Sequence, residues 1–347
     1  MSRGKKVIVG MSGGVDSSVS AALLKKQGFE VRGAFMKLFR GSSEKEVRKI
    51  AKKLNIPFLV FDFSKDFQSK IIDFFLKDYS RGITPNPCVN CNREIKFGLL
   101  LKKIMGLGAD YIATGHYARI VFDKESQKYK LMKGKDKTKD QSYFLWTLSQ
   151  NHLQRIIFPV GGYTKKDVRR LAEKLSIASV VKKESEDICF IKNSFEDFIK
   201  KHICLKEGPI VDRNGKELGR HSGLALYTIG QRKKIKIPSG KPYYVIGMDF
   251  KKNTLLVSQD ENDLYQKELI AEKVNWVSGE EPDFPISVSA KIRYGHKGAR
   301  VIVKKQGKKI KVVFSKPQRA ITPGQSVVFY KSQEALGGGI ITSFQKQ

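Results

Sequence analysis

Short apolar runs alternate with amphipathic stretches along roughly the first third of the chain. Four of these runs have the length and apolar character of buried strands, and they lie at residues 6–10, 30–36, 57–61 and 111–115. Between and around them, apolar side chains recur at helical spacing over residues 19–27, 44–54, 66–80 and 95–104. Strands that alternate with helices predict an α/β fold with a doubly wound parallel sheet, in which ligands lie at the carboxyl ends of the strands.

The pattern changes after about residue 205, where short strands and turns replace the long helices. Asn214-Gly215 lies between extended segments and is typical of a hairpin turn. From about residue 268, β-branched runs alternate with glycine turns, which favours a small barrel or sandwich. We therefore predict three domains: a catalytic domain over residues 1–204, a small mixed central domain over residues 205–267, and a C-terminal β-barrel over residues 268–347.

Charge adds a hint about partners. The 347 residues include 66 Lys and Arg against 34 Asp and Glu, a formal net charge of +32. This excess favours a polyanionic partner such as nucleic acid, the ribosome or an anionic membrane, although a generally lysine-rich proteome would produce it too. An apolar content of 40% excludes a wholly disordered basic tail. No stretch approaches the roughly 20 apolar residues of a membrane span, and the start does not resemble a secretory signal, so we expect a cytoplasmic protein.

A glycine-rich loop lies between the first predicted strand and the helix that follows it. Its residues are Gly10, Met11, Ser12, Gly13, Gly14, Val15, Asp16 and Ser17. Small residues there let backbone N–H groups close around an anion at a helix N-terminus. The loop lacks the lysine of the G-x-x-x-x-G-K-[ST] motif, and it is not G-x-G-x-x-G. A plain turn with a serine-rich helix cap is the alternative interpretation.

Four cysteines are far too few for a disulfide scaffold in a chain of this length. Cys88 and Cys91 form a C-x-x-C pair, for which catalysis, redox chemistry and metal binding all have to be considered. Cys91 precedes the helix predicted from Ile95, and we expect the helix dipole to favour its thiolate. Cys204 lies between isoleucine and leucine and is interpreted as a small buried side chain.

Several motifs together resemble a known family. Residues 12–17 (SGGVDS) resemble the pyrophosphatase loop of the N-type ATP pyrophosphatases, which cleave ATP between the α- and β-phosphates and adenylate a carbonyl oxygen. Further motifs lie at residues 84–97 (TPNPCVNCNREIKF), 113–118 (ATGHYA), 139–144 (KDQSYF), 185–190 (SEDICF) and 228–232 (TIGQR). In this order they resemble the bacterial tRNA-specific 2-thiouridylase family over residues 10–325. The resemblance implies ATP-dependent 2-thiolation of the wobble uridine of tRNA, with adenylation of the C2 oxygen and release of AMP and pyrophosphate.

The resemblance also implies roles for individual residues. Cys189 would carry a persulfide and Cys91 would be the facing nucleophile, and the two would close a disulfide as the reaction ends. ATP would contact the whole loop from Gly10 to Ser17 together with Met36 and Gly115. The target base would lie at Asn86, Pro87 and Cys88. The residues implied in tRNA binding are His116, Lys139, Asp140, Gln141, Arg293, Tyr294 and Gln325.

Implied cofactors and partners are ATP with Mg²⁺, tRNAs with Lys-, Glu- and Gln-type anticodons, and a sulfur donor such as a cysteine desulfurase or a sulfur-relay protein. The chain departs from the family at Cys88, where many members carry an aspartate. Cys88, Cys91 and Cys189 would supply three thiolates for a 4Fe-4S cluster, a second route for sulfur transfer. A ligase with an amine nucleophile, such as a lysidine synthetase, and a ribosomal RNA-binding protein remain further alternatives.

Overall fold

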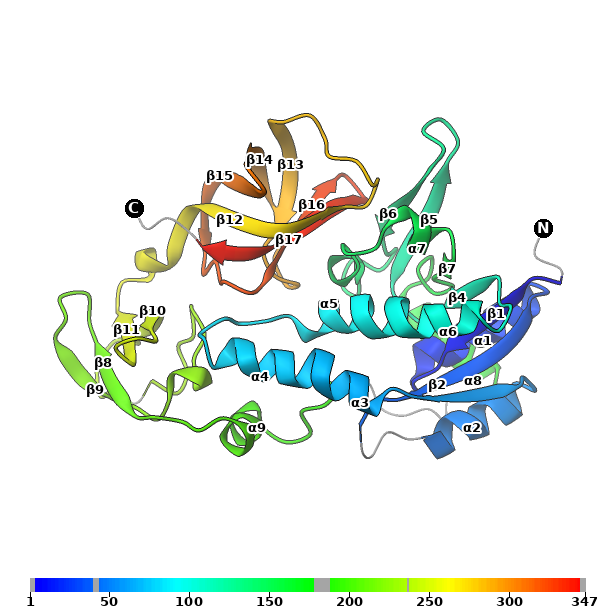
Figure 1. The fold of residues 1–347 in the computed structure, drawn as a ribbon, viewed down its shortest axis with the longest axis horizontal. Helices are drawn as coiled ribbons and strands as arrows, with labels where there is room; N and C mark the ends of the chain where they lie inside the picture. Colours follow the sequence, from blue (N-terminus) through cyan, green and yellow to red (C-terminus); the bar gives the residue numbers. More distant parts are fainter. Residues whose placement is uncertain (1–3, 40–43, 178–187, 236, 344–347) are drawn as a thin grey trace.

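The computed structural model describes residues 4–39, 44–177, 188–235 and 237–343. Figure 1 shows a parallel sheet with its helices at one end of the molecule, a small sheet at the other, and a β-barrel above the helices that connect them. The predicted α/β domain, small central domain and C-terminal barrel are therefore all present. None of the helices within the described ranges is long and apolar enough to cross a membrane.

The N-terminal sheet has five parallel strands in the order β3-β2-β1-β4-β7. Its strands are β1 (Lys6–Gly10), β2 (Glu30–Lys37), β3 (Phe58–Asp62), β4 (Tyr111–Ala113) and β7 (Ile156–Ile157). The chain leaves β1 toward β2 on one side and returns to β4 on the other, so the strand order reverses between β1 and β4. Ligands of open parallel sheets bind at such a switch point, beside the carboxyl ends of the strands.

Helices cover both faces of this sheet because alternate residues of β1 point in opposite directions. Val7 and Val9 pack in one cluster with α1 (Val15–Lys26) and α2 (Glu44–Lys53), while Ile8 packs on the opposite face. That opposite face is covered by two helical segments that share a core. Their elements are α3 (Ser64–Phe67), η1 (Gln68–Ile72), α4 (Asp73–Tyr79), α5 (Pro87–Cys91), η2 (Asn92–Leu100) and α6 (Leu101–Met105).

Two predicted helix starts are wrong. Helix α1 begins at Val15 rather than at residue 19. Its first turn contains serines that are buried, and a pattern based on apolar residues does not detect buried serines. The helix predicted from Ile95 begins at Pro87, with Asn86 as its N-cap, and continues through a π-helical stretch to Met105. Asparagine followed by proline is a typical helix start. The polar residues after it and the wider π-turn hide the apolar periodicity.

The second half of the chain forms two further sheets. The central sheet has the order β10-β11-β8-β9, and the barrel closes through pairing of β12 with β17. The central elements are β8 (Gly208–Val211), β9 (Glu217–His221), β10 (Tyr244–Asp249) and β11 (Thr254–Ser258). The barrel strands are β12 (Tyr265–Trp276), β13 (Ile286–Lys291), β14 (Ala299–Gln306), β15 (Lys309–Arg319), β16 (Ser326–Lys331) and β17 (Glu334–Ser343). The remaining short elements are η3 (Ser142–Phe144), α7 (Gln150–Leu153), α8 (Lys165–Lys174), α9 (Phe195–His202), η4 (Leu224–Leu226) and η5 (Glu261–Leu264).

A hairpin that the sequence patterns did not predict joins the catalytic domain to the barrel. It consists of β5 (Ala118–Asp123) and β6 (Lys128–Lys133), and β6 pairs with β17. Behind it, the indole N–H of Trp146 donates to Ser326 Oγ at 3.0 Å, and the Tyr143 hydroxyl donates to the Ser326 carbonyl at 2.9 Å. Both aromatic side chains are buried. The barrel is therefore held against the catalytic domain by a shared core.

Candidate functional site

The glycine-rich loop lies at the switch point of the parallel sheet, between β1 and α1. Gly13 has a φ of +84°, a conformation that glycine adopts without strain. The Ser12 N–H donates to Ser17 Oγ at 3.3 Å, and that hydroxyl donates to the Gly14 carbonyl at 3.1 Å. Gly14 is the N-cap of α1 and has no side chain to satisfy the first N–H groups of the helix. The loop thus has the shape and polarity of an anion-binding site.

Gly115 follows β4 and packs directly against the start of α1. A Cβ atom at this position would lie 2.7 Å from Ser17 N and 2.9 Å from the Asp16 Cβ, closer than real Cβ contacts. Both neighbouring atoms belong to the beginning of α1, so they cannot move aside without moving the loop. The glycine is therefore required for the close approach of the segments that follow β1 and β4.

If the loop binds the phosphates of ATP, as the resemblance implies, Gly115→Ala should displace the loop and lower ATP-dependent pyrophosphate release at least about tenfold. Gly162→Ala is a matched control, because a Cβ there meets nothing within 4 Å. Pyrophosphate release by the purified variants is the measurement. Wild-type release in Gly115→Ala would contradict the role given to this contact.

A partly buried ion pair adjoins the loop, and the sequence patterns did not indicate it. Lys165 Nζ donates to both carboxylate oxygens of Asp16, at 2.7 and 2.8 Å, and the Tyr117 hydroxyl donates to one of them at 2.7 Å. The side chain of Lys165 is only 10% exposed. Thr164 caps α8 in a capping box with Asp167, which places Lys165 in the first turn. The capping box is readable in the sequence, but it does not distinguish this lysine from the other basic residues of the chain.

Three cysteines from two distant segments lie within electrostatic reach of one another. Burial raises the pKa of the Cys91 thiol to about 12, and the nearby Cys189 and Cys88 thiols also raise it. Burial is likewise the main cause of the raised pKa of Cys189, followed by Cys88. Cys91 is 9% exposed, whereas Cys189 retains an accessible surface. All four cysteines are free, so the implied Cys91–Cys189 disulfide is not formed in this state.

The expected helix-dipole effect on Cys91 is wrong for this state. Cys91 lies one turn inside the helix, and Cys88 instead occupies the first turn after Pro87. Removal from water raises the Cys91 pKa far more than nearby charges lower it. The cation that lowers the pKa of both Cys91 and Cys189 is Lys96, which lies on η2 five residues after Cys91. A π-helix pairs residues five apart, which brings Lys96 back to the level of Cys91.

The thiols do not have the arrangement of an iron–sulfur site in this structure. Within the described residues, no three or more His, Cys, Asp or Glu side chains form a group that could hold a metal ion. The Cys88 and Cys189 thiols both influence the pKa of Cys91, but the Cys91 side chain is enclosed, with only 9% of its surface exposed. As they stand in this structure, Cys88, Cys91 and Cys189 do not fit a cluster, and we derive no step through one.

The residues implied at the target base lie at the start of α5, where a loop of the barrel supports them. The Asn86 side chain accepts from the Val89 N–H at 3.3 Å, and Pro87 is the first helical residue. Gln325, implied in tRNA binding, donates its amide to the Thr84 carbonyl at 3.0 Å. The Thr84 N–H donates to the Pro323 carbonyl at 3.0 Å. The barrel therefore holds the segment that leads directly into the cysteine helix.

Three other residues implied in tRNA binding make contacts inside the protein. His116 is buried, its Nδ1 lies 2.7 Å from Thr114 Oγ1, and burial holds its pKa well below the usual value. Asp140 is buried and accepts from the Gly134 N–H at 3.0 Å. Gln141 Oε1 accepts from the Tyr117 N–H at 3.0 Å. In this state these side chains hold loops of the catalytic domain, and Gln141 holds Tyr117, which contacts Asp16 of the glycine-rich loop.

The other implied contacts are more accessible. Arg293 is half-buried and donates to the Arg319 carbonyl at 3.0 Å. Tyr294 is 38% exposed, and its ring lies against Phe144 in a tilted arrangement, with centroids 4.7 Å apart and an interplanar angle of 32°. Lys139 is partly exposed, beside buried Asp140. Met36 is partly buried on β2 and packs against the core beneath the helices.

An anion-binding loop at the switch point of a parallel sheet, with a lysine–aspartate pair behind it, defines an ATP-pyrophosphatase-like protein of the α/β class. Models of known families match three parts of the chain: a "tRNA methyl transferase HUP domain" at residues 5–193, a "tRNA methyl transferase PRC-barrel domain" at 196–259 and an "Aminomethyltransferase beta-barrel domain" at 266–341. Relatives that are 45–47% identical and cover 97% of this chain carry the name tRNA-specific 2-thiouridylase, and the chain belongs to that family.

Two curated relatives of nearly equal length carry that assignment, and the solved structure named after them is only a partial likeness. The chain is 47% identical over 337 residues to the tRNA-specific 2-thiouridylase MnmA of Syntrophomonas wolfei, covering 97% of this chain and 99% of the relative. It is 45% identical to the enzyme of the same name from Carboxydothermus hydrogenoformans, covering 97% of each chain. A solved structure of a 4-thiouridine synthetase–RNA complex with bound ATP has a TM-score of 0.34 at 18% identity, covering 51% of this chain and 42% of that one.

Proposed function

We propose that this protein is a tRNA-uridine 2-sulfurtransferase that uses ATP to replace the C2 oxygen of the wobble uridine (U34) by sulfur. Support comes from full-length similarity to 2-thiouridylases, and above all from an anion-binding loop and a cluster of three thiols in one domain. Replacement of a carbonyl oxygen needs two such parts. One activates the oxygen as a leaving group, and the other delivers a nucleophilic sulfur.

In the activating half, the uridine C2 oxygen attacks the α-phosphorus of ATP, and the bond to the β-phosphate oxygen breaks. The products are the adenylated base and pyrophosphate. The N–H groups of the glycine-rich loop and the first turn of α1 are suited to stabilise the negative charge on the leaving phosphates. Lys165 would add a positive charge behind Asp16. Mg²⁺ is expected to enter with the phosphates of ATP, since this ion prefers phosphate oxygens and retains much of its hydration.

In the sulfur-transfer half, the terminal sulfur of a persulfide on Cys189 attacks C2, and AMP leaves with the original oxygen. The thiolate of Cys91 then attacks Cys189 Sγ, which breaks the bond between Sγ and the transferred sulfur. This step releases 2-thiouridine and leaves a Cys91–Cys189 disulfide, which an external thiol must reduce before the next turnover. A cysteine desulfurase or a sulfur-relay protein is the expected source of the persulfide sulfur. The accessible surface of Cys189 favours delivery to that residue.

Lys96 is expected to set the pH dependence of this second half. Its charge lowers the pKa of both Cys91 and Cys189, so Lys96→Gln should raise both pKa values and reduce the thiolate fraction at neutral pH. We expect thiolation at pH 7 to fall about three- to tenfold and to recover as the pH rises. Lys96→Arg retains the charge and should retain the wild-type profile. A pH–rate profile of thiolation, with pyrophosphate release as the reference, tests this; an unshifted Lys96→Gln profile would rule it out.

The assignment is tested with purified protein, ATP, a tRNA substrate and a sulfur source. Formation of 2-thiouridine at the wobble position together with pyrophosphate release is the expected result. A ligase with an amine nucleophile would release pyrophosphate but leave no labelled sulfur in the tRNA. An RNA-binding protein without catalytic activity would bind tRNA and release no pyrophosphate. Either result would refute the proposal.

Because the three thiols do not fit a cluster as they stand in this structure, we propose the persulfide route. A cluster is the competing route to test, since the resemblance implies an aspartate in many family members where this chain has Cys88. Iron and acid-labile sulfide measurements on protein purified without oxygen distinguish the routes. The persulfide route predicts thiolation by iron-free protein. Thiolation that requires about four irons per chain, and that is lost in Cys88→Ser together with the iron, would favour the cluster.

A further inference from the structure

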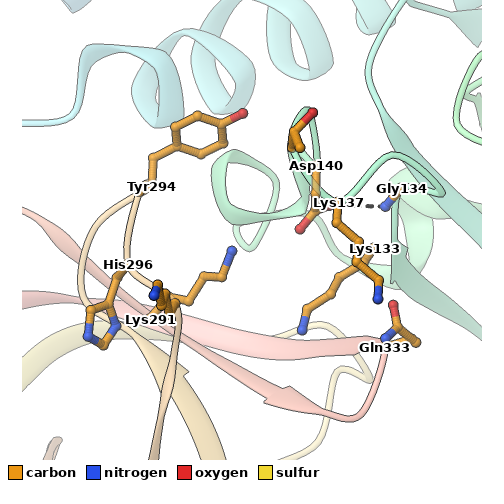
Figure 2. A pocket seen from close by; sticks show the side chains of 11 residues that line it. Lys133, Gly134, Lys137, Asp140, Lys291, Tyr294, His296 and Gln333 are labelled. Carbon is orange, nitrogen blue, oxygen red and sulfur yellow. Dashed lines mark hydrogen bonds between the residues drawn. The ribbon is translucent and has the colours of Figure 1, made fainter. Parts of the chain in front are cut away.

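A basic pocket of about 430 Å³ opens between the catalytic domain and the barrel. Figure 2 shows Lys133 and Lys137 on the catalytic-domain side and Lys291 on the barrel side, with side chains that extend into the space between. The full lining consists of Lys133, Gly134, Lys137, Thr138, Asp140, Lys291, Tyr294, Gly295, His296, Lys297 and Gln333. One wall of the pocket is therefore formed by the end of β6 and the loop that follows it, and the other by the end of β13 and the loop between β13 and β14.

The charge of this pocket is strongly positive. Four lysines line it against a single carboxylate, Asp140, which already accepts hydrogen bonds from the Gly134 N–H and from Ser142. Within the described part of the chain, none of the four lysines forms an ion pair. His296 adds no positive charge, because burial lowers its pKa. The pocket therefore has cations available for an anionic ligand.

Two of these lysines come from different domains and converge on one ring. Lys133 Nζ lies 4.4 Å from the centroid of Tyr330, and Lys291 Nζ lies 5.9 Å from the same centroid. Lys133 also donates to the Ser332 carbonyl at 3.2 Å. Partial burial and repulsion by Lys291 both lower the pKa of Lys133. An anion between the two ammonium groups would relieve this repulsion.

The pocket is connected to the cysteine site through one aromatic layer. Tyr294 lines the pocket, and its ring contacts the Phe144 ring in a tilted arrangement. The Phe144 carbonyl accepts a hydrogen bond of 3.0 Å from the Asn92 side chain, and Asn92 follows Cys91 directly. An RNA strand with one base at the cysteines would therefore pass the pocket with a neighbouring nucleotide.

We propose that this pocket binds a backbone phosphate of the tRNA anticodon loop next to the target base, held between Lys133 of the catalytic domain and Lys291 of the barrel. The exposed Tyr294 face offers a stacking surface for an adjoining base. Because the phosphate is held by both domains, bound RNA would bridge their junction. This inference rests on the proposed function, since it takes tRNA as the polyanion.

The test measures tRNA affinity of the full-length protein over a series of salt concentrations, without ATP. We expect the double variant Lys133→Gln/Lys291→Gln to raise Kd about tenfold and to reduce the slope of log K against log salt by about 0.7, the value for one single-strand phosphate contact. The double variant Lys133→Arg/Lys291→Arg retains both charges and should keep the wild-type slope. Lys308→Gln is the matched control, because it lies in the turn at the opposite end of β14 from the pocket.

An unchanged Kd and salt slope in the folded Gln double variant would overturn the proposal. Free anions are tested with inorganic phosphate and pyrophosphate as ligands. Loss of pyrophosphate binding without any change in tRNA affinity would assign the pocket to a free anion and would also overturn it. Because binding is measured without turnover, the result is independent of catalysis. A wild-type protein that binds tRNA with the expected slope but makes no 2-thiouridine would refute only the proposed function.

Discussion

Cys189→Ser and Cys91→Ser are each expected to lower thiolation of tRNA by about 10³-fold or more, while tRNA-stimulated pyrophosphate release continues. The reason is the division of labour in the proposed reaction. A serine at position 189 cannot carry a persulfide, and a serine at position 91 cannot release the sulfur from Cys189. Neither residue belongs to the glycine-rich loop at which the phosphates of ATP are proposed to bind. Thiolated nucleoside and pyrophosphate, measured in the same reaction, separate the two halves.

Cys204→Ser is the matched control for these variants. Cys204 is a free, exposed cysteine just after α9, and it is not among the groups that influence the pKa of Cys91 or Cys189. It should retain wild-type thiolation. Its exposure also corrects the sequence-based interpretation of Cys204 as a buried side chain, because the end of a short surface helix leaves its flanking residues in solvent. Full thiolation by Cys91→Ser or Cys189→Ser would eliminate the proposed transfer route.

Lys165→Met should abolish the activating half, with pyrophosphate release lowered by about 10²-fold or more. Methionine fills most of the lysine volume but removes both hydrogen bonds to Asp16, which is then held by Tyr117. Loss of one partner of this mostly buried pair leaves a poorly compensated carboxylate beside the site for the ATP phosphates. Because the Asp16 side chain is 31% exposed, we expect a stability loss of only about 1–3 kcal/mol, smaller than for a fully buried pair.

Lys166→Met provides the control. Lys166 is the next residue on α8 and is exposed, and its substitution removes the same charge. It should release pyrophosphate at the wild-type rate. Thermal melting of both variants shows whether lost activity follows from unfolding. A folded Lys165→Met protein with normal pyrophosphate release would show that the ion pair is structural only.

Loss of thiolation in the cysteine variants and loss of pyrophosphate release in Lys165→Met would locate the two halves of the reaction in different parts of one domain. The activating half depends on the segments after β1 and β4 and on the start of α8, which meet at the switch point of the sheet. The sulfur-transfer half depends on the helix that begins at Pro87 and on the segment around Cys189. The barrel contacts the segment that leads into that helix, where Gln325 donates to the Thr84 carbonyl. A tRNA bound to the barrel is therefore in a position to influence the cysteine site.

Much of the fold could be predicted from the sequence because strand and helix periodicity are local properties. The apolar run at residues 6–10, the glycines that follow it and the alternation of later runs predicted the parallel sheet and its loop. The β-branched runs after residue 268 predicted the C-terminal barrel. The hairpin over residues 118–133 escaped prediction, because its alternating pattern is short and its partner strand is β17, about 200 residues away.

The sequence by itself determined the order of strands and helices, the phosphate-type loop after the first strand, and the presence of thiols near motifs typical of sulfur transfer. Only the tertiary structure decided that Cys88, Cys91 and Cys189 share one environment, that burial raises the pKa of Cys91, and that Lys165 pairs with Asp16. The physical reason is that pKa and ion pairing depend on desolvation and distance, which arise from packing between segments far apart in the chain.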